Sequence, residues 1–197
     1  MSNKRGIEFA VGTIVLIILA ILAFTFALAI TFKIFGGAED IKSQIDSKTQ
    51  AQIEAAMTRT NELVSVPFNI KQIKPGNAVT FGVGVKNILS PRDFSASISF
   101  DGAYFPDGNP ISVDPGIVEE KWLGNFKLVH EFNLKKNDYS IIPITIFASP
   151  DVGGHLEKGD YVFNVCVFDK AVPDDCASAS LSDVYTNRKY QVVVRLI

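Results

Sequence analysis

The pattern of hydrophobic and polar residues sets the N-terminal part of the chain apart from the rest. Residues 9–32 carry no charged side chain and are rich in Ile, Leu, Val, Ala and Phe. As a helix they would extend about 36 Å, which is enough to cross a bilayer. A secretory signal has an apolar region about half as long, and core helices are seldom apolar on every face. We therefore predict a transmembrane helix over residues 9–35, preceded by a basic leader at residues 1–8.

The segment that follows has the composition of a helix but not the hydrophobicity of a membrane span. Residues 38–64 contain no Gly or Pro and are rich in Ala, Gln, Glu and Lys, which favours helix. Their apolar stripe is thin, which indicates partial burial. A helical stalk is expected over residues 36–64. It would dock on the following domain or pair with a second copy, rather than stand in solvent as a spacer.

From residue 65 the hydrophobic pattern changes to period two, as in half-buried strands. Residues 79, 81, 83 and 85 are all apolar, as are residues 161, 163, 165 and 167, and Pro, Gly, Asn and Asp supply the turns. Seven or more short strands without intervening helices indicate an antiparallel β-sandwich over residues 65–197. Pro143 places its own strand at a sheet edge or in a bulge. The predicted fold class is therefore mainly β, with an immunoglobulin-like sandwich behind a membrane helix and a stalk.

The charged residues beside the apolar stretch indicate on which side of the membrane each end of the chain would lie. Lys4 and Arg5 precede it directly, and the positive-inside rule then favours a cytoplasmic N-terminus. The expected location is the cell membrane, crossed once, with the C-terminal domain outside the cytoplasm.

Cys166 and Cys176 are the two cysteines of the chain. Cys166 alternates with Tyr161, Phe163 and Val165 along its strand, so it should point away from the core of the sandwich. The residues between the cysteines include a proline and polar turn formers, so the chain can double back. Free thiols in a reducing cytosol are the alternative. The predicted orientation instead favours a Cys166–Cys176 disulfide.

Residues typical of catalytic or metal sites are sparse. His130 and His155 are far apart and belong to no metal-binding motif. The glycines of residues 82–86 (G-V-G-V-K) lie within a strand pattern and lack phosphate-loop spacing, so they should serve backbone packing. The net charge of −2 gives no basic face for nucleic acid. We expect no enzyme activity, no cofactor, no metal and no nucleic-acid partner.

The stretch 141–168 ends in the pattern G-x-Y-x-F-x-V-x-V, which starts at Gly159. This stretch resembles the last hairpin of immunoglobulin-like domains in prokaryotic surface proteins. The resemblance implies that Tyr161 forms a structural corner by a hydrogen bond to the backbone. Such modules bind, space or assemble, and the fold does not choose among these roles.

The first residues, M-S-N-K-R-G-I-E-F-A-V-G, resemble the leader of archaeal type IV pilin-like proteins. Lys4, Arg5 and Gly6 match the processing junction of that family. The resemblance implies that a membrane peptidase cuts after Gly6 and leaves Ile7 as the new N-terminus. It also implies a helix that anchors the subunit and then packs in a filament core.

Small residues recur on one face of the predicted membrane helix, where another helix could approach closely. They are Gly12, Ala20, Ala23, Ala27 and Thr31. The alternative is that Ala and Gly are simply frequent in membrane helices.

Together these patterns predict a non-enzymatic, membrane-anchored structural protein of the cell surface, a pilin-like subunit of a filament or of its accessory complex. Its partners would be the lipid bilayer and copies of itself or other pilin-like subunits. The alternative is an uncleaved, single-pass immunoglobulin-like module that binds a surface partner.

Overall fold

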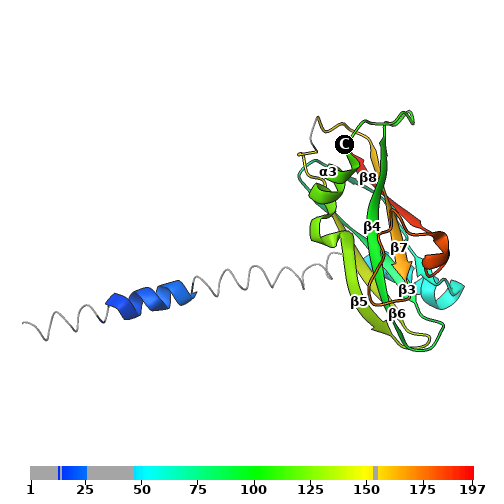
Figure 1. The fold of residues 1–197 in the computed structure, drawn as a ribbon, viewed down its shortest axis with the longest axis horizontal. Coiled ribbons are helices and arrows are strands. Elements are labelled where there is room, and N and C mark those ends of the chain that lie inside the picture. Colours follow the sequence, from blue (N-terminus) through cyan, green and yellow to red (C-terminus); the bar gives the residue numbers. More distant parts are fainter. Residues whose placement is uncertain (1–12, 14, 26–46, 153–154) are drawn as a thin grey trace, which may run out of the picture. The chain divides into compact units, whose positions relative to one another are not determined.

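The computed structural model describes residues 13, 15–25, 47–152 and 155–197, without the side chains of residues 130 and 131 (Figure 1). The chain divides into two compact units, Met1–Ser43 and Gln44–Ile197. In the first unit, residues 15–25 are helical and exposed.

The predicted transmembrane helix over residues 9–35 is not supported. Among the residues that the structure describes, none of the helices has both the length and the hydropathy that crossing a bilayer requires. The single-pass, membrane and pilin-like descriptions that rested on this helix are corrected accordingly.

The residues proposed for leader processing and helix packing fall mostly outside the described part. Lys4, Arg5, Gly6 and Ile7 lie outside the described residues, as do Gly12, Ala27 and Thr31. Ala20 and Ala23 lie on the exposed helix of residues 15–25.

The predicted helical stalk over residues 36–64 is also wrong. Helix α2 (Ser47–Ala55) continues into a π-helical turn, η1 (Ala56–Thr60), and strand β1 already begins at Val64. Ile53 and Met57 are completely buried against β3. The helix is therefore a docked part of the second unit, which was one of the expected alternatives.

The second unit is a sandwich of two sheets. One sheet has the order β1-β3-β6 and the other the order β2-β8-β7-β4-β5. The strands are β1 (Val64–Ser65), β2 (Ile70–Ile73), β3 (Ala78–Lys86), β4 (Arg92–Tyr104), β5 (Leu128–Leu134), β6 (Tyr139–Phe147), β7 (Asp160–Phe168) and β8 (Tyr190–Leu196). Residues of β3 and β6 from one sheet and of β8, β7 and β4 from the other share one hydrophobic core.

Strand pairing departs from the prediction at one place. The pairs β1/β3, β3/β6, β4/β5, β4/β7 and β7/β8 are antiparallel, whereas β2 pairs with β8 in parallel. The sandwich is therefore not purely antiparallel. The prediction for Pro143 is confirmed, because β6 is an edge strand and Pro143 pairs with Gly82 of β3.

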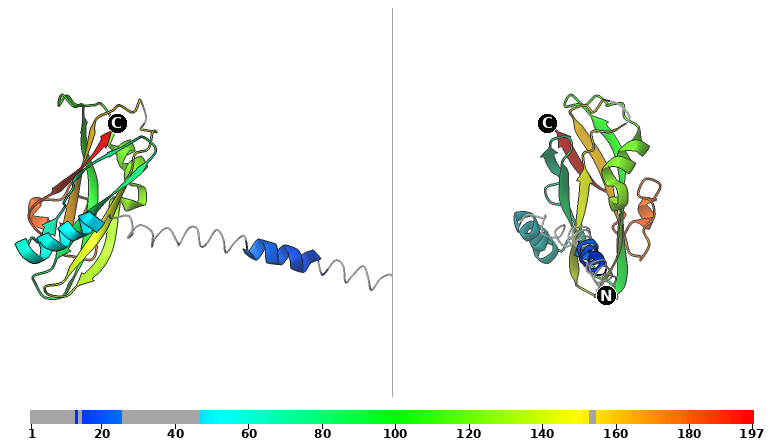
Figure 2. Two further views of the ribbon diagram at one scale, coloured as in Figure 1. Left: turned by 180° about the vertical axis from the view of Figure 1, so that it is seen from behind. Right: turned by 90° about the vertical axis from the view of Figure 1, so that its left-hand side faces the viewer.

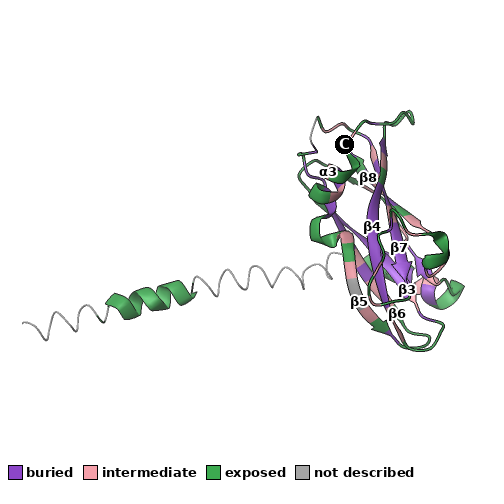
Figure 3. Ribbon diagram, in the orientation of Figure 1, coloured by how far each residue is buried: buried purple, intermediate pink, exposed green. Residues whose placement is uncertain are grey.

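The core is formed by the inward positions of β3, β4, β6, β7 and β8. Figure 3 shows burial running along β4 and β7. Phe81 and Val83 of β3 and Phe163 and Val165 of β7 are completely buried. The alternation read from the sequence thus identifies the core faces of these strands.

A short helical crossover joins β4 to β5 and was not predicted. It comprises α3 (Pro115–Val118), η2 (Glu119–Leu123) and the 3-10 turn η3 (Gly124–Lys127). Trp122 on η2 enters the core, 4.6 Å from Tyr161 between ring centroids. Its indole nitrogen donates a hydrogen bond to the Ser149 carbonyl beyond β6, at 3.1 Å. The crossover therefore ties the two sheets together.

Docking of α2 depends on the missing side chain of Gly84. A Cβ at Gly84 would collide with Ile53 Cγ2 and lie 2.9 Å from Met57 Cε. We expect Gly84→Ala to lower the free energy of unfolding by about 1–3 kcal/mol through overpacking. Urea unfolding followed by the fluorescence of Trp122, the single tryptophan, measures this.

The control is a double-mutant cycle with Ile53→Ala, which removes the colliding methyl. Ile53→Ala alone should cost about 2–5 kcal/mol. The double variant should lose less than the sum of the two, with a coupling of about 0.5–3 kcal/mol. If the loss in the free energy of unfolding of the double variant equals the sum of the two single losses, the proposed contact is wrong.

Candidate interaction surface

A disulfide-bonded loop covers one half of the outer face of the five-stranded sheet. The predicted disulfide is present: Cys166 of β7 bonds to Cys176, with their Cα atoms 5.5 Å apart. Cys166 points away from the sandwich core, but it is completely buried in a second apolar cluster with Phe168, Cys176 and Val184. In the right-hand view of Figure 2, α2 lies on one side of the sandwich and this orange loop, with η4 (Leu181–Asp183), on the other.

Hydroxyl groups on the outer face of β4 bind the same loop. Ser95 Oγ donates to the Lys170 carbonyl and Ser97 Oγ to the Asp174 carbonyl, each at 2.7 Å. Both serines are completely buried. Since a buried hydroxyl without a partner is costly, these hydrogen bonds favour one position of the loop.

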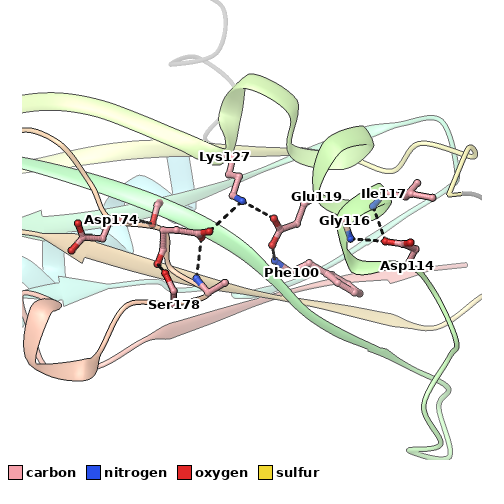
Figure 4. Close-up of polar contacts among 11 residues, drawn as sticks. Phe100, Asp114, Gly116, Ile117, Glu119, Lys127, Asp174 and Ser178 are labelled. Carbon is pink, nitrogen blue, oxygen red and sulfur yellow. Dashed lines mark hydrogen bonds and ion pairs between the residues drawn. The ribbon is translucent and has the colours of Figure 1, made fainter.

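An ion-pair cluster connects the loop to the helical crossover (Figure 4). Lys127 Nζ lies 2.7 Å from Glu119 Oε2 and 3.7 Å from Asp175 Oδ2. Glu119 Oε1 also accepts a hydrogen bond from the Phe100 amide, at 2.9 Å. The hydrogen bond that Lys127 donates to Glu119 raises the pKa of Lys127. An ammonium held protonated in this way is suited to a structural contact rather than to proton transfer.

The other half of the outer face is open and is organised in three rows that cross the strands. The register pairs Ile70 of β2 with Val193 of β8, Val193 with Val162 of β7, and Val162 with Gly102 of β4. We call these four residues the apolar row. Ile70 is 51% exposed, and a Cβ on Gly102 would lie 2.9 Å from Tyr104 Oη. The Tyr104 side chain therefore covers the place that a side chain on Gly102 would fill.

A charged row lies on one side of the apolar row. It consists of Gln72, Arg195, Asp160 and Tyr104, which pair across the same four strands. Arg195 binds Asp160 in a bidentate ion pair, with Nε–Oδ1 at 2.6 Å and the second contact at 2.7 Å. The hydrogen bond from Arg195 lowers the pKa of Asp160.

An amide row lies on the other side. Gln191 Nε2 donates to Asn164 Oδ1 at 3.4 Å, and Asn164 Nδ2 donates to Asp101 Oδ1 at 2.8 Å. Asn69 Nδ2 donates to the Gln191 carbonyl at 3.2 Å. A hollow of about 350 Å³ adjoins this row and is also lined by Arg188, whose guanidinium lies 5.8 Å from the Tyr190 ring centroid.

Tyr161, the predicted corner residue, has a structural position. Its hydroxyl donates to the Glu157 carbonyl at 3.0 Å, and its ring is completely buried against Trp122. Burial raises the pKa of Tyr161 to about 12. The residue is therefore placed to brace the start of β7, and its side chain faces the core on the opposite side of the strand from the open face.

The described residues contain no group of three His, Cys, Asp or Glu side chains placed to hold a metal ion. The hydrophobic pattern of the sequence did not predict the three rows. Their alternation with core positions was visible, but the register that aligns them across four strands was not.

The chain matches no protein-family model and no curated protein. Its fold has distant likenesses among solved structures. An alkylpurine DNA glycosylase from Pseudomonas fluorescens aligns at a TM-score of 0.39 and 10% identity, over 76% of this chain and 35% of that one. A family 123 glycoside hydrolase from Clostridium perfringens aligns at a TM-score of 0.37 and 12% identity, over 65% of this chain and 22% of that one.

A third likeness is to WR4, an MSP family member from C. elegans, with a TM-score of 0.35 and 11% identity over 69% of this chain and 99% of that one. The chain thus spans well under two thirds of the first two proteins. None of the three identifies a family for it.

The pair of Asp160 and Arg195 predicts a pH dependence of stability. The folded-state pKa of Asp160 lies below its ordinary value of 3.8. The pair therefore stabilises the fold at pH values above 3.8. This contribution is lost as pH falls through the folded pKa. We expect the free energy of unfolding to fall more steeply between about pH 5 and pH 2 in the wild type than in Asp160→Asn.

Urea titrations at a series of pH values measure this slope. Arg195→Gln should flatten the slope in the same way, because it removes the partner that lowers the pKa of Asp160. Slopes equal to the wild type in both variants would contradict the assignment.

Proposed function

We propose that this chain is a non-enzymatic protein of the cell surface, whose β-sandwich serves as a structural or binding module outside the cytoplasm. The observation that carries the proposal is the Cys166–Cys176 disulfide. Protein disulfides persist in oxidising compartments and are rare in the cytosol.

The surroundings of the disulfide support a permanent structural bond. Both cysteines are completely buried, and the Cys176 carbonyl accepts a hydrogen bond from Lys189 Nζ at 2.7 Å. Closing a loop of this length stabilises a fold by about 2–3 kcal/mol. The bond holds a loop that covers half of one sheet, as expected of a structural bridge rather than an exposed redox pair.

The state of the polar side chains supports binding rather than catalysis. Lys127 is engaged by Glu119 and Asp175, and Asp160 is engaged by Arg195. The open face combines an apolar centre with a polar rim, which is the general anatomy of a protein interaction surface.

Thiol trapping in the native host tests this proposal. Cells are quenched in acid, and the protein is alkylated before and after reduction and analysed by mass spectrometry. We expect neither cysteine to be alkylated without reductant and both to be alkylated after it. A cytosolic protein with free thiols serves as the control for trapping.

Protease added to intact cells tests the location of the domain. We expect residues 47–197 to be digested on intact cells or found outside them, while a cytosolic control protein survives. A domain that resists protease until the cells are broken, with both thiols alkylated directly, would refute the proposal.

A further inference from the structure

We infer that the open half of the five-stranded sheet, made of the apolar, charged and amide rows, binds a second copy of this chain. Binding of a second copy to this face does not depend on where in the cell the protein is located.

The open half is a part of the sandwich that no described segment covers. Helix α2 covers β3 on the outer face of the three-stranded sheet. The loop of residues 169–189 covers β4 and β7 near Ser95, Ser97 and Cys166. What remains is the end of the sheet where Ile70, Val193 and Val162 face outward.

The order of residues within each row is self-complementary. Consider a two-fold axis that runs along the strands between β7 and β8, so that each row of one copy lies over the same row of the other in reverse order. In the apolar row, Val193 of one copy then opposes Val162 of the other, and each Ile70 opposes Gly102. Ile70 protrudes and Gly102 has no side chain, so Ile70 would pack on the Tyr104 ring that covers this glycine.

The two polar rows match themselves under the same rotation. Arg195 of one copy opposes Asp160 of the other, so opposite charges meet and the row carries no net charge. Gln191 opposes Asn164, and an amide group can both donate and accept hydrogen bonds. A contact in which residue i meets j and j meets i is the requirement for an isologous dimer.

The geometry also fits sheet packing. The rotation leaves the strands of the two copies aligned, and sheets that pack face to face keep their strand directions within about 30° at a separation of about 10 Å. The four strands span about 15 Å, so the contact is smaller than a standard interface. We therefore expect a weak dimer, with a dissociation constant on the order of 10–100 µM.

Sedimentation velocity of the full chain in a mild nonionic detergent, from about 1 to 300 µM, brackets that affinity. We expect a reversible dimer in the wild type. Val193→Glu and Ile70→Lys should each weaken it at least about tenfold. Val193→Glu places an unpaired charge in the dry centre of the contact, and Ile70→Lys replaces the apolar side chain that would pack on Tyr104 of the other copy. The matched control is Val172→Glu on the covering loop, where the valine is 75% exposed; it should leave the dimer unchanged.

Thermal unfolding of each variant shows whether the fold is retained. Ile70 lies half-exposed on an edge strand, so Ile70→Lys keeps the test valid even if Val193→Glu unfolds.

Disulfide cross-linking tests the orientation. A mixture of Val162→Cys and Val193→Cys chains, oxidised with copper phenanthroline, should form a mixed dimer in higher yield than either variant alone. Val172→Cys mixed with Val193→Cys should not cross-link. A wild type that stays monomeric throughout the concentration range, or a dimer that survives both Ile70→Lys and Val193→Glu, would overturn the inference.

Discussion

The central strands of this sandwich must be covered on both faces, and most other features of the domain follow from that constraint. Along β3 the buried positions run without interruption from Val79 to Val85, although only alternate residues reach the core between the sheets. The last four residues of β7 and a run of seven in β4 are likewise buried on both faces. A sheet face buried in this way needs a second layer, and this chain supplies one for each sheet from its own sequence.

The two covering layers use different chemistry because the faces beneath them differ. On β3 the helix α2 approaches so closely that Gly84 must lack a side chain, and the contact with Ile53 and Met57 is apolar. On β4 the outward side chains are serines, and a helix, whose carbonyls are bonded internally, would leave their hydroxyls without partners. An irregular loop has free carbonyls, and those of Lys170 and Asp174 accept from Ser95 and Ser97. The disulfide then fixes the loop beside a small apolar cluster with Phe168 and Val184.

Much of the sandwich could be predicted from the sequence, because one-sided burial leaves a period-two pattern. That pattern identified the core positions of β3 and β7, and Pro143 marked an edge strand correctly. The disulfide was also predicted. The outward side of β7 and the turn residues allowed it, but the choice of a disulfide over free thiols rested on the expected orientation across a membrane. The stalk was wrong because the helical composition of residues 36–64 does not show what a helix packs on, and the contacts of α2 with β3 decide that.

Long-range contacts were beyond a single sequence for the same reason. The crossover is marked locally by Asp114 and Pro115, an N-cap followed by proline, but the insertion of Trp122 against Tyr161 depends on tertiary packing. The parallel pairing of β2 with β8 joins residues more than a hundred positions apart. The open face depends on the register of four strands, so none of its rows could be recognised before the topology was known.

The covered and open halves of the five-stranded sheet differ in what they require of a neighbour. The covered half presents buried hydroxyls, so whatever lies on it must offer acceptors at fixed positions, and a segment of the same chain can be held there covalently. The open half presents Ile70, Val193 and Val162, which need only a surface that excludes water. Its polar groups are already satisfied at the rim by the pair of Arg195 and Asp160 and by the Asn164–Asp101 hydrogen bond. A neighbour on this half therefore gains apolar contact without having to supply specific partners, which allows a separate molecule to bind and leave there while the other half stays closed.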